Sequence, residues 1–214
     1  MNADGEQGRL EQVFRECLDR YSDGSVYRCA GCVHEDVAGL GGISGWFEVR
    51  FVAPSKWRFH YITVEVGPYG RSGPEYFAAM HGEGGSWVVR SGDDGVLAGR
   101  RVSSVEEAVD SLAGVTRMAA PLFAGAFGMT NKFALRAGAW LNLESMQSSF
   151  DGRIVVQCRE SGRHHVTWQM LIDPAMGGRI RRFVRQSGDE IVSIEVMSEW
   201  GPASIDEAWF EWRE

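Results

Sequence analysis

Apolar and polar residues alternate along the stretch from Ile43 to Val66. One side of the extended chain carries six apolar residues: Phe47, Val49, Phe51, Trp57, Phe59 and Tyr61. The other side carries polar residues: Glu48, Arg50, Lys56, Arg58 and His60. A period of two is typical of antiparallel strands with one buried face and one face in water. Pro54 cannot donate a hydrogen bond to a neighbouring strand, so we expect a turn at residues 53–55 and a hairpin around it.

The chain before and after this hairpin predicts one helix and further strands. Residues 1–8 are polar and acidic, and we expect them to be disordered. Apolar residues then recur at helical spacing, which predicts a helix from about Arg9 to Tyr21 with Gly24 as its C-cap. The glycine-rich segment 39–42 is expected to be a flexible connection, and segment 67–74 a loop. Strands are predicted at residues 25–37, 75–81 and 86–91.

The middle of the chain changes to a helical pattern. Ser103 or Ser104 stands three residues before a glutamate, which is the spacing of a capping box, and the helix that follows is broken at Gly114. A second apolar segment, 115–127, is expected to be helical with a kink at Pro121. Because strands flank this region on both sides, we expect the two helices to cover the apolar face of a sheet as a lid.

The last third of the chain returns to strands. Short turns separate the five predicted strands, which span residues 140–146, 153–160, 164–172, 180–186 and 190–200. Turns this short predict sequential antiparallel pairing, and the tail 205–212 is expected to add a last edge element. The sequence therefore predicts an α+β fold, mostly antiparallel β, with residues 9–214 in a single domain.

Composition narrows the possible classes of function. The 214-residue chain has 22 Lys and Arg against 29 Asp and Glu, a net charge of −7, which argues against a nucleic-acid partner. Hydrophobic residues make up 44%, enough for a full core, but no apolar run approaches the roughly 18 residues of a membrane span. The acidic start does not look like a signal peptide. A cytosolic protein and an exported protein shown without its leader both remain open.

This order of elements resembles the lipoprotein-carrier (LolA-like) superfamily over most of the chain. The stretch Trp46–Tyr61 is similar to the strand–proline–strand hairpin of that superfamily, which ends in aromatic residues. Leu171–Pro174 with Gly178–Arg182 looks like its later hairpin, an aspartate followed by a turn and a basic, apolar strand. The carrier proper has an arginine directly before the hairpin proline, whereas this chain has Ala53, which puts lipoprotein carriage itself in doubt.

The resemblance implies an unclosed β-barrel whose concave apolar face is covered by helices and takes up acyl chains. It also implies a periplasmic or other cell-envelope location. The candidate ligand-binding residues are those of the apolar hairpin face and of the lid: Phe47, Val49, Phe51, Trp57, Phe59, Tyr61, Met118, Leu122 and Phe123. An ordinary filled core has the same alternation, so both a cavity and a packed interior are compatible with these residues.

Metal and catalytic sites have weak support in the sequence. Cys29 and Cys32 have the spacing of half a zinc site, but a second such pair is absent, so we expect no metal. The two thiols are expected on opposite faces of one strand, and buried free thiols are expected overall. His164 and His165 are expected on opposite faces of another strand, and His60 on a solvated face. The sequence shows no nucleophile paired with a histidine, and it predicts neither an enzyme nor a cofactor.

The leading hypothesis from the sequence is a non-catalytic binding protein for a lipid, an acyl chain or a lipoprotein. Such a protein would be a monomer that does not span the membrane. An envelope sensor or protein-interaction module with the same fold is the first alternative. An enzyme that acts on a small molecule is the second.

Overall fold

The structure is a computed structural model that describes residues 3–22, 26–52, 55–64, 74–91, 95–130, 141–176, 178–200 and 210. The described helices are α1 (Ala3–Ser22), α2 (Val105–Ala113) and α3 (Ala119–Ala126), with a 3₁₀ turn at Pro174–Met176. The strands of the first half are β1 (Val26–Val37), β2 (Leu40–Val52), β3 (Lys56–Thr63), β4 (Tyr76–Gly82), β5 (Gly85–Ser91) and β6 (Leu97–Val102). Those of the second half are β7 (Leu141–Ser148), β8 (Ile154–Glu160), β9 (Val166–Asp173), β10 (Arg179–Ser187) and β11 (Glu190–Trp200).

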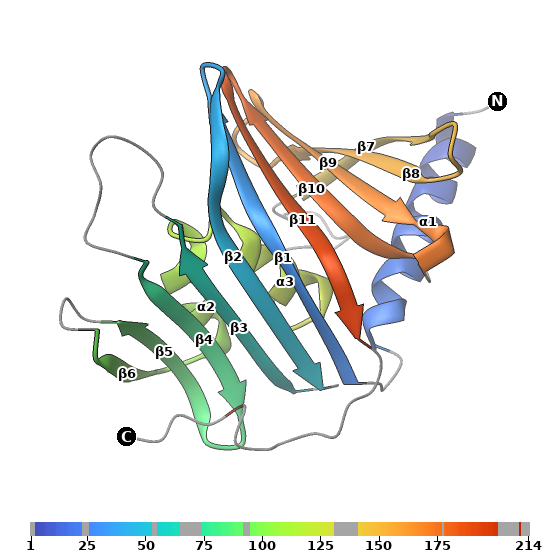
Figure 1. The fold of residues 1–214 in the computed structure, drawn as a ribbon. Coiled ribbons are helices and arrows are strands. Elements are labelled where there is room, and N and C mark those ends of the chain that lie inside the picture. Colours follow the sequence, from blue (N-terminus) through green and yellow to red (C-terminus); the bar gives the residue numbers. More distant parts are fainter. Residues whose placement is uncertain are drawn as a thin grey trace.

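The strands form a single antiparallel sheet of eleven strands in the order β6-β5-β4-β3-β2-β1-β11-β10-β9-β8-β7. Sequential hairpins build each half, and the pairing of β1 with β11 joins the halves. The sheet curves without closing, because β6 and β7 lie at its two ends (Figure 1). The predicted α+β fold with an unclosed barrel is therefore confirmed.

The helices pack on the apolar, concave face of the sheet. Helix α1 contacts β7 and β10, α2 contacts β4, β5 and β6, and α3 packs beside α2. Figure 1 shows α2 and α3 behind the central strands and α1 at the other end of the sheet, near β10. One hydrophobic cluster joins side chains of all three helices to those of the sheet.

The β2–β3 hairpin has the predicted register. Phe47 pairs with Tyr61, Val49 with Phe59, and Phe51 with Trp57, so that all six apolar side chains lie on one face. Each of them is at most 3% exposed. The period of two was a reliable guide here because a shift of one residue would expose every one of these side chains.

The helix boundaries agree in part with the prediction. Ser104 caps α2 by accepting a hydrogen bond from the Glu107 backbone N–H at 3.1 Å, and the Glu107 carboxylate accepts from the Ser103 N–H at 2.9 Å. Helix α2 ends at Ala113, as the glycine at 114 predicted. Helix α3 begins only at Ala119, and the predicted kink at Pro121 is wrong. Pro121 lies in the first turn of α3, where a missing N–H removes no intrahelical hydrogen bond.

Other boundaries differ from the prediction. Helix α1 begins at Ala3 rather than at Arg9, so residues 3–8 are helical where disorder was expected. Gly41 and Gly42 belong to β2 and not to a flexible connection. Strand β6 was missed because it is an edge strand with a polar sequence, of which only Val102 is buried. His164 and His165 are both exposed in the turn before β9, so the predicted strand alternation of the pair is wrong.

Some predictions concern residues outside the described part of the chain: the C-cap at Gly24, the turn at Pro54, most of the loop 67–74, and the tail 205–212 apart from Phe210. Phe210 is 2% exposed. Within the described ranges, none of the helices combines the length and the apolarity that crossing a bilayer requires.

Candidate functional site

The structure brings the predicted ligand-binding residues together on the concave face. Eight of the nine belong to the main hydrophobic cluster and are almost fully buried: Phe47, Val49, Phe51, Trp57, Phe59, Tyr61, Leu122 and Phe123. The ninth, Met118, is partly buried and packs against the same cluster. Strands β2 and β3 contribute the sheet side of this hydrophobic interior, and the α2–α3 segment packs over it.

Aromatic rings of the lid occupy the interior. The ring centroid of Phe123 lies 5.1 Å from that of Phe47 and 6.0 Å from that of Phe183 on β10. Phe127, directly after α3, stacks on Phe51 with a centroid distance of 4.5 Å. All eight residues of α3 are buried. In this conformation the side chains of the lid therefore lie where an apolar ligand on the concave face would lie.

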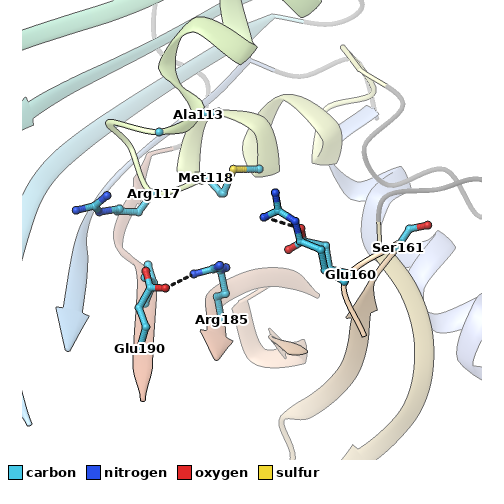
Figure 2. Close-up of a pocket in the computed structure, with 10 residues that line it drawn as sticks. Ala113, Arg117, Met118, Glu160, Ser161, Arg185 and Glu190 are labelled. Atoms are coloured by element: carbon cyan, nitrogen blue, oxygen red, sulfur yellow. Dashed lines mark hydrogen bonds and ion pairs between the residues drawn. The ribbon is translucent and has the colours of Figure 1, made fainter. Parts of the chain in front are cut away.

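A pocket of about 510 Å³ opens at the end of the interior where the α2–α3 turn meets the sheet (Figure 2). We call it the mouth pocket. It is lined by Ala113, Gly114, Arg117, Met118, Glu160, Ser161, Arg163, Arg185, Glu190 and Val192. Met118 belongs both to this lining and to the contacts of the hydrophobic cluster, so it joins the pocket to the interior.

Arginines compensate the two carboxylates of the mouth pocket. Glu160 is only 6% exposed; it accepts a hydrogen bond from Trp168 Nε1 at 3.3 Å and lies 3.5 Å from Arg163 Nη1. Arg185 Nη1 donates to Glu190 Oε2 at 2.9 Å. The rim is thus highly polar but nearly balanced in charge, while Met118, Ala113 and Val192 provide its apolar part.

The lid turn at residues 114–118 has an unusual backbone. Arg117 and Met118 have φ angles of 49° and 74°, a left-handed conformation that is uncommon for residues other than glycine. Several hydrogen bonds hold it: Met118 N–H donates to Ala113 O at 2.8 Å, and the Thr116 hydroxyl donates to Leu112 O at 2.8 Å. Arg117 Nε donates to Glu35 Oε2 on β1 at 2.8 Å. This ion pair ties the lid turn to the sheet.

Removing this tie is expected to loosen the lid turn. Because the pair is partly exposed, Glu35→Gln should cost at most about 1 kcal/mol, which corresponds to an increase of up to about fivefold in local opening. Amide hydrogen exchange at Thr116 and Met118 measures this change. Glu144→Gln is the matched control, because it breaks the ion pair between Glu144 of β7 and Arg159 of β8. Unchanged exchange in Glu35→Gln would show that the ion pair does not hold the turn.

The outer face of the sheet carries a separate polar network. Glu48 forms ion pairs with Arg28 at 2.9 Å and with Arg50, and His60 lies next to it on β3. His60 is on the outer face as predicted, but it is largely buried rather than solvated, and burial together with Arg58 lowers its pKa to about 3. A second cleft, of about 530 Å³, is lined by residues that include His34, Arg182 and Glu195.

The cysteines lie on both faces. Cys29 and Cys32 lie on opposite faces of β1, as predicted. Cys29 faces the interior, and Cys32 lies on the outer face, where its Sγ is 3.1 Å from His34 Nε2. All four cysteines are buried. Burial raises the pKa of Cys17 and that of Cys29 to about 12, so that both are neutral thiols near pH 7.

Sequence reasoning missed the mouth pocket. Glu160 ends β8, Arg185 lies near the end of β10, and Arg117 belongs to the lid turn, so no local pattern connects them. One signal was present: in an antiparallel meander, alternate turns lie at the same end of the sheet. The predicted strand order already placed the β8–β9 and β10–β11 turns at one end.

No protein-family model and no curated protein matches this sequence. Solved structures similar to it include the LppX lipoprotein of Mycobacterium tuberculosis, with 15% identity over 93% of this chain and 99% of that one, at a TM-score of 0.43. They also include LprF of Mycobacterium bovis, with 11% identity over 93% and 96% of the two chains, at a TM-score of 0.42. A LolA superfamily protein of Nitrosomonas europaea has 8% identity over 94% and 97%, at a TM-score of 0.43. A member of the superfamily predicted from the sequence is thus among the solved structures similar to this chain.

Proposed function

We propose that this protein is a non-catalytic binding protein for an apolar ligand: a lipid, an acyl chain or the lipid part of a lipoprotein. The observation that carries the proposal is the curved sheet, whose concave face is aromatic and is covered by a helical segment that ends in a pocket. Ligand would take the place of lid side chains such as Phe123 against Phe47, Phe59 and the other residues of the concave face.

The mouth pocket supports an amphiphilic ligand. Met118 provides an apolar path from the pocket to the interior, and the arginine–glutamate pairs around it can solvate a polar head group. Because each carboxylate of the rim already lies beside an arginine, this arrangement suits holding a polar group at the surface while a chain extends inward. A cell-envelope location, which the sequence resemblance implies, and a monomeric state are part of this proposal.

A charge introduced between the mouth pocket and the interior tests the proposal. Met118→Lys places an ammonium group between the mouth pocket and the interior, and we expect it to weaken the binding of a fluorescent fatty acid by about tenfold. Met197→Lys is the matched control, because Met197 is 57% exposed on β11. Displacement titrations with the fatty acid provide the affinities, and native mass spectrometry of the untreated protein detects any lipid that copurifies. A protein that is empty and does not bind the fatty acid would refute the proposal.

The packed interior favours a second candidate, a protein-interaction module of the same architecture. In that case the rings of Phe123 and Phe127 are permanent core and never leave the concave face. The two candidates predict different rates of amide hydrogen exchange in α3. A lid that admits lipid must open, so its amides must exchange on the timescale of ligand uptake. Exchange of α3 only through global unfolding would favour the interaction module.

A further inference from the structure

Trp57 contains a buried polar group for which the described residues provide no partner. It lies on β3 in a row with Phe51 of β2 and Tyr27 of β1, on the concave face, and its exposed fraction is 0%. Its indole Nε1 is buried and has no hydrogen-bond partner within the described part of the chain. Buried polar groups are nearly always paired, so a buried donor without an acceptor requires an explanation.

Trp168 shows that this fold can satisfy a buried indole. Trp168, on β9, is also 0% exposed, and its Nε1 donates to the Glu160 carboxylate at 3.3 Å. Some arginine nitrogens are also buried without a partner, but they indicate a missing ligand less strongly than the indole does. Each guanidinium has five N–H donors, whereas an indole has only one. Trp57 and Trp168 are therefore equally buried, and they differ in that the described residues provide an acceptor for Trp168 alone.

A second unpaired group follows α3 in the chain. Thr130 is 7% exposed, and its hydroxyl oxygen also has no partner in the described residues. Thr130 follows Phe127 by three residues, and Phe127 stacks on Phe51, the cross-strand neighbour of Trp57. Thr130 thus directly follows the segment whose aromatic ring, that of Phe127, covers the row of Phe51 and Trp57.

The row of Trp57 lies far from the mouth pocket. Glu190 of the mouth pairs with Val37 at the end of β1, whereas Trp57 is in the row of Tyr27 near its start. The ten residue steps from Tyr27 to Val37 correspond to about 30 Å along an extended strand. A polar group held at Trp57 is therefore separate from a head group held at the mouth.

We propose that Trp57 Nε1 is the polar anchor of a deep subsite, which takes an uncharged hydrogen-bond acceptor carried within an apolar ligand. The inference rests on the proposed function and narrows its ligand to a class: molecules with an ester or ketone oxygen distant from any charged group. The indole N–H can only donate, so it selects acceptors. Phe51 on β2 and the stacked ring of Phe59 beside Trp57 carry no charge. His81, the neighbour of Trp57 on β4, lies with Nδ1 2.8 Å from Ser86 Oγ. Lys and Arg are absent from these three neighbours, so the subsite suits an uncharged acceptor rather than a carboxylate.

A pair of neutral probes tests this subsite. Methyl palmitate and heptadecane have the same number of carbon atoms and differ in the ester group. Both are offered together to the full chain from methyl-β-cyclodextrin, the protein is separated by gel filtration, and bound probe is quantified by mass spectrometry. We expect the bound ester-to-alkane ratio to fall by about three- to tenfold in Trp57→Phe relative to the wild type. Trp87→Phe is the control, because Trp87 packs in the separate cluster of Ala78, Met80 and Val89, and it should keep the wild-type ratio.

The outcomes separate the two proposals. Equal ratios in the wild type and Trp57→Phe overturn the subsite and leave the binding proposal intact, whereas a protein that takes up neither probe overturns the binding proposal. A second readout uses the folded wild type alone: in ¹⁵N-labelled protein, the Trp57 indole N–H resonance should move downfield with methyl palmitate and not with heptadecane. An indole resonance that does not respond to bound ester would also overturn the subsite.

Discussion

Phe59→Ala is expected to lower the free energy of unfolding by about 3–5 kcal/mol, the usual cost of removing a buried phenylalanine ring. Phe59 is 0% exposed at the centre of the concave face, where its ring stacks on those of Phe47 and Trp57 at centroid distances of 5.8 and 6.2 Å. Phe123 of the lid lies 6.4 Å away, so the substitution removes contacts with both layers. Urea denaturation followed by circular dichroism measures the change.

Phe150→Ala is the matched control for this experiment. Phe150 is fully exposed in the turn between β7 and β8, and its removal should change the free energy of unfolding by no more than about 0.5 kcal/mol. A loss below about 1 kcal/mol in Phe59→Ala would contradict the register of the hairpin, because only an exposed ring is removed at so little cost.

His60 is expected to make the fold less stable as the pH falls from 7 to 5. Burial, with the nearby charge of Arg58, lowers the pKa of His60 from its ordinary value of 6.5 to about 3. Below pH 6.5 the unfolded chain binds a proton at this residue and the folded chain does not. The stability that neutral His60 contributes is therefore present above pH 6.5 and is lost as the pH falls towards 3. At pH 5 the loss is about 2 kcal/mol, from about 1.4 kcal/mol for each pH unit below 6.5.

The groups that face His60 determine which variant tests this expectation. Glu48 of β2 and Ala78 of β4 are the cross-strand neighbours of His60, and the centroid of the Tyr76 ring lies 5.7 Å from that of His60. Glu48 itself forms ion pairs with Arg28 and Arg50. His60→Gln keeps a polar side chain of similar size and should flatten the pH dependence between 7 and 5. His164→Gln, in an exposed turn, should leave the dependence unchanged. Equal slopes for the wild type and His60→Gln in urea titrations would show that His60 is protonated in the folded state.

The strands of this protein could be predicted because their burial is one-sided. The alternation of Phe47, Val49 and Phe51 with Glu48 and Arg50 reports directly which face is covered, and the five strands of the meander follow from turns with clear glycine signals. Strand β6 breaks this rule: it lies at the edge of the sheet and buries little, so its sequence has no reason to alternate. Prediction succeeded where burial imposes a period and failed where it does not.

The site was predictable only in its apolar part. The residues of the concave face and of α3 are buried together in one cluster, as a covered apolar face requires, while their role in ligand binding stays a prediction. The mouth pocket is formed by three segments that meet only in the folded chain. The left-handed backbone of Arg117 and Met118 could not be predicted, because neither residue is a glycine or an asparagine. The position of α3 was misjudged for a related reason: residues 115–118 are compatible with a helix, but hydrogen bonds such as that of Met118 to Ala113 hold them in a turn.

In the proposed function, in which the lid opens to admit ligand, the left-handed pair in the lid turn contributes to the energy of opening. A residue other than glycine in this conformation carries about 1 kcal/mol of conformational energy, so Arg117 and Met118 together store about 2 kcal/mol while the lid is closed. An open lid in which both residues relax regains that energy, and the gain offsets part of the cost of separating α3 from the sheet. The balance between the closed and the open lid would therefore depend on the backbone of Arg117 and Met118 as well as on the apolar area that α3 covers.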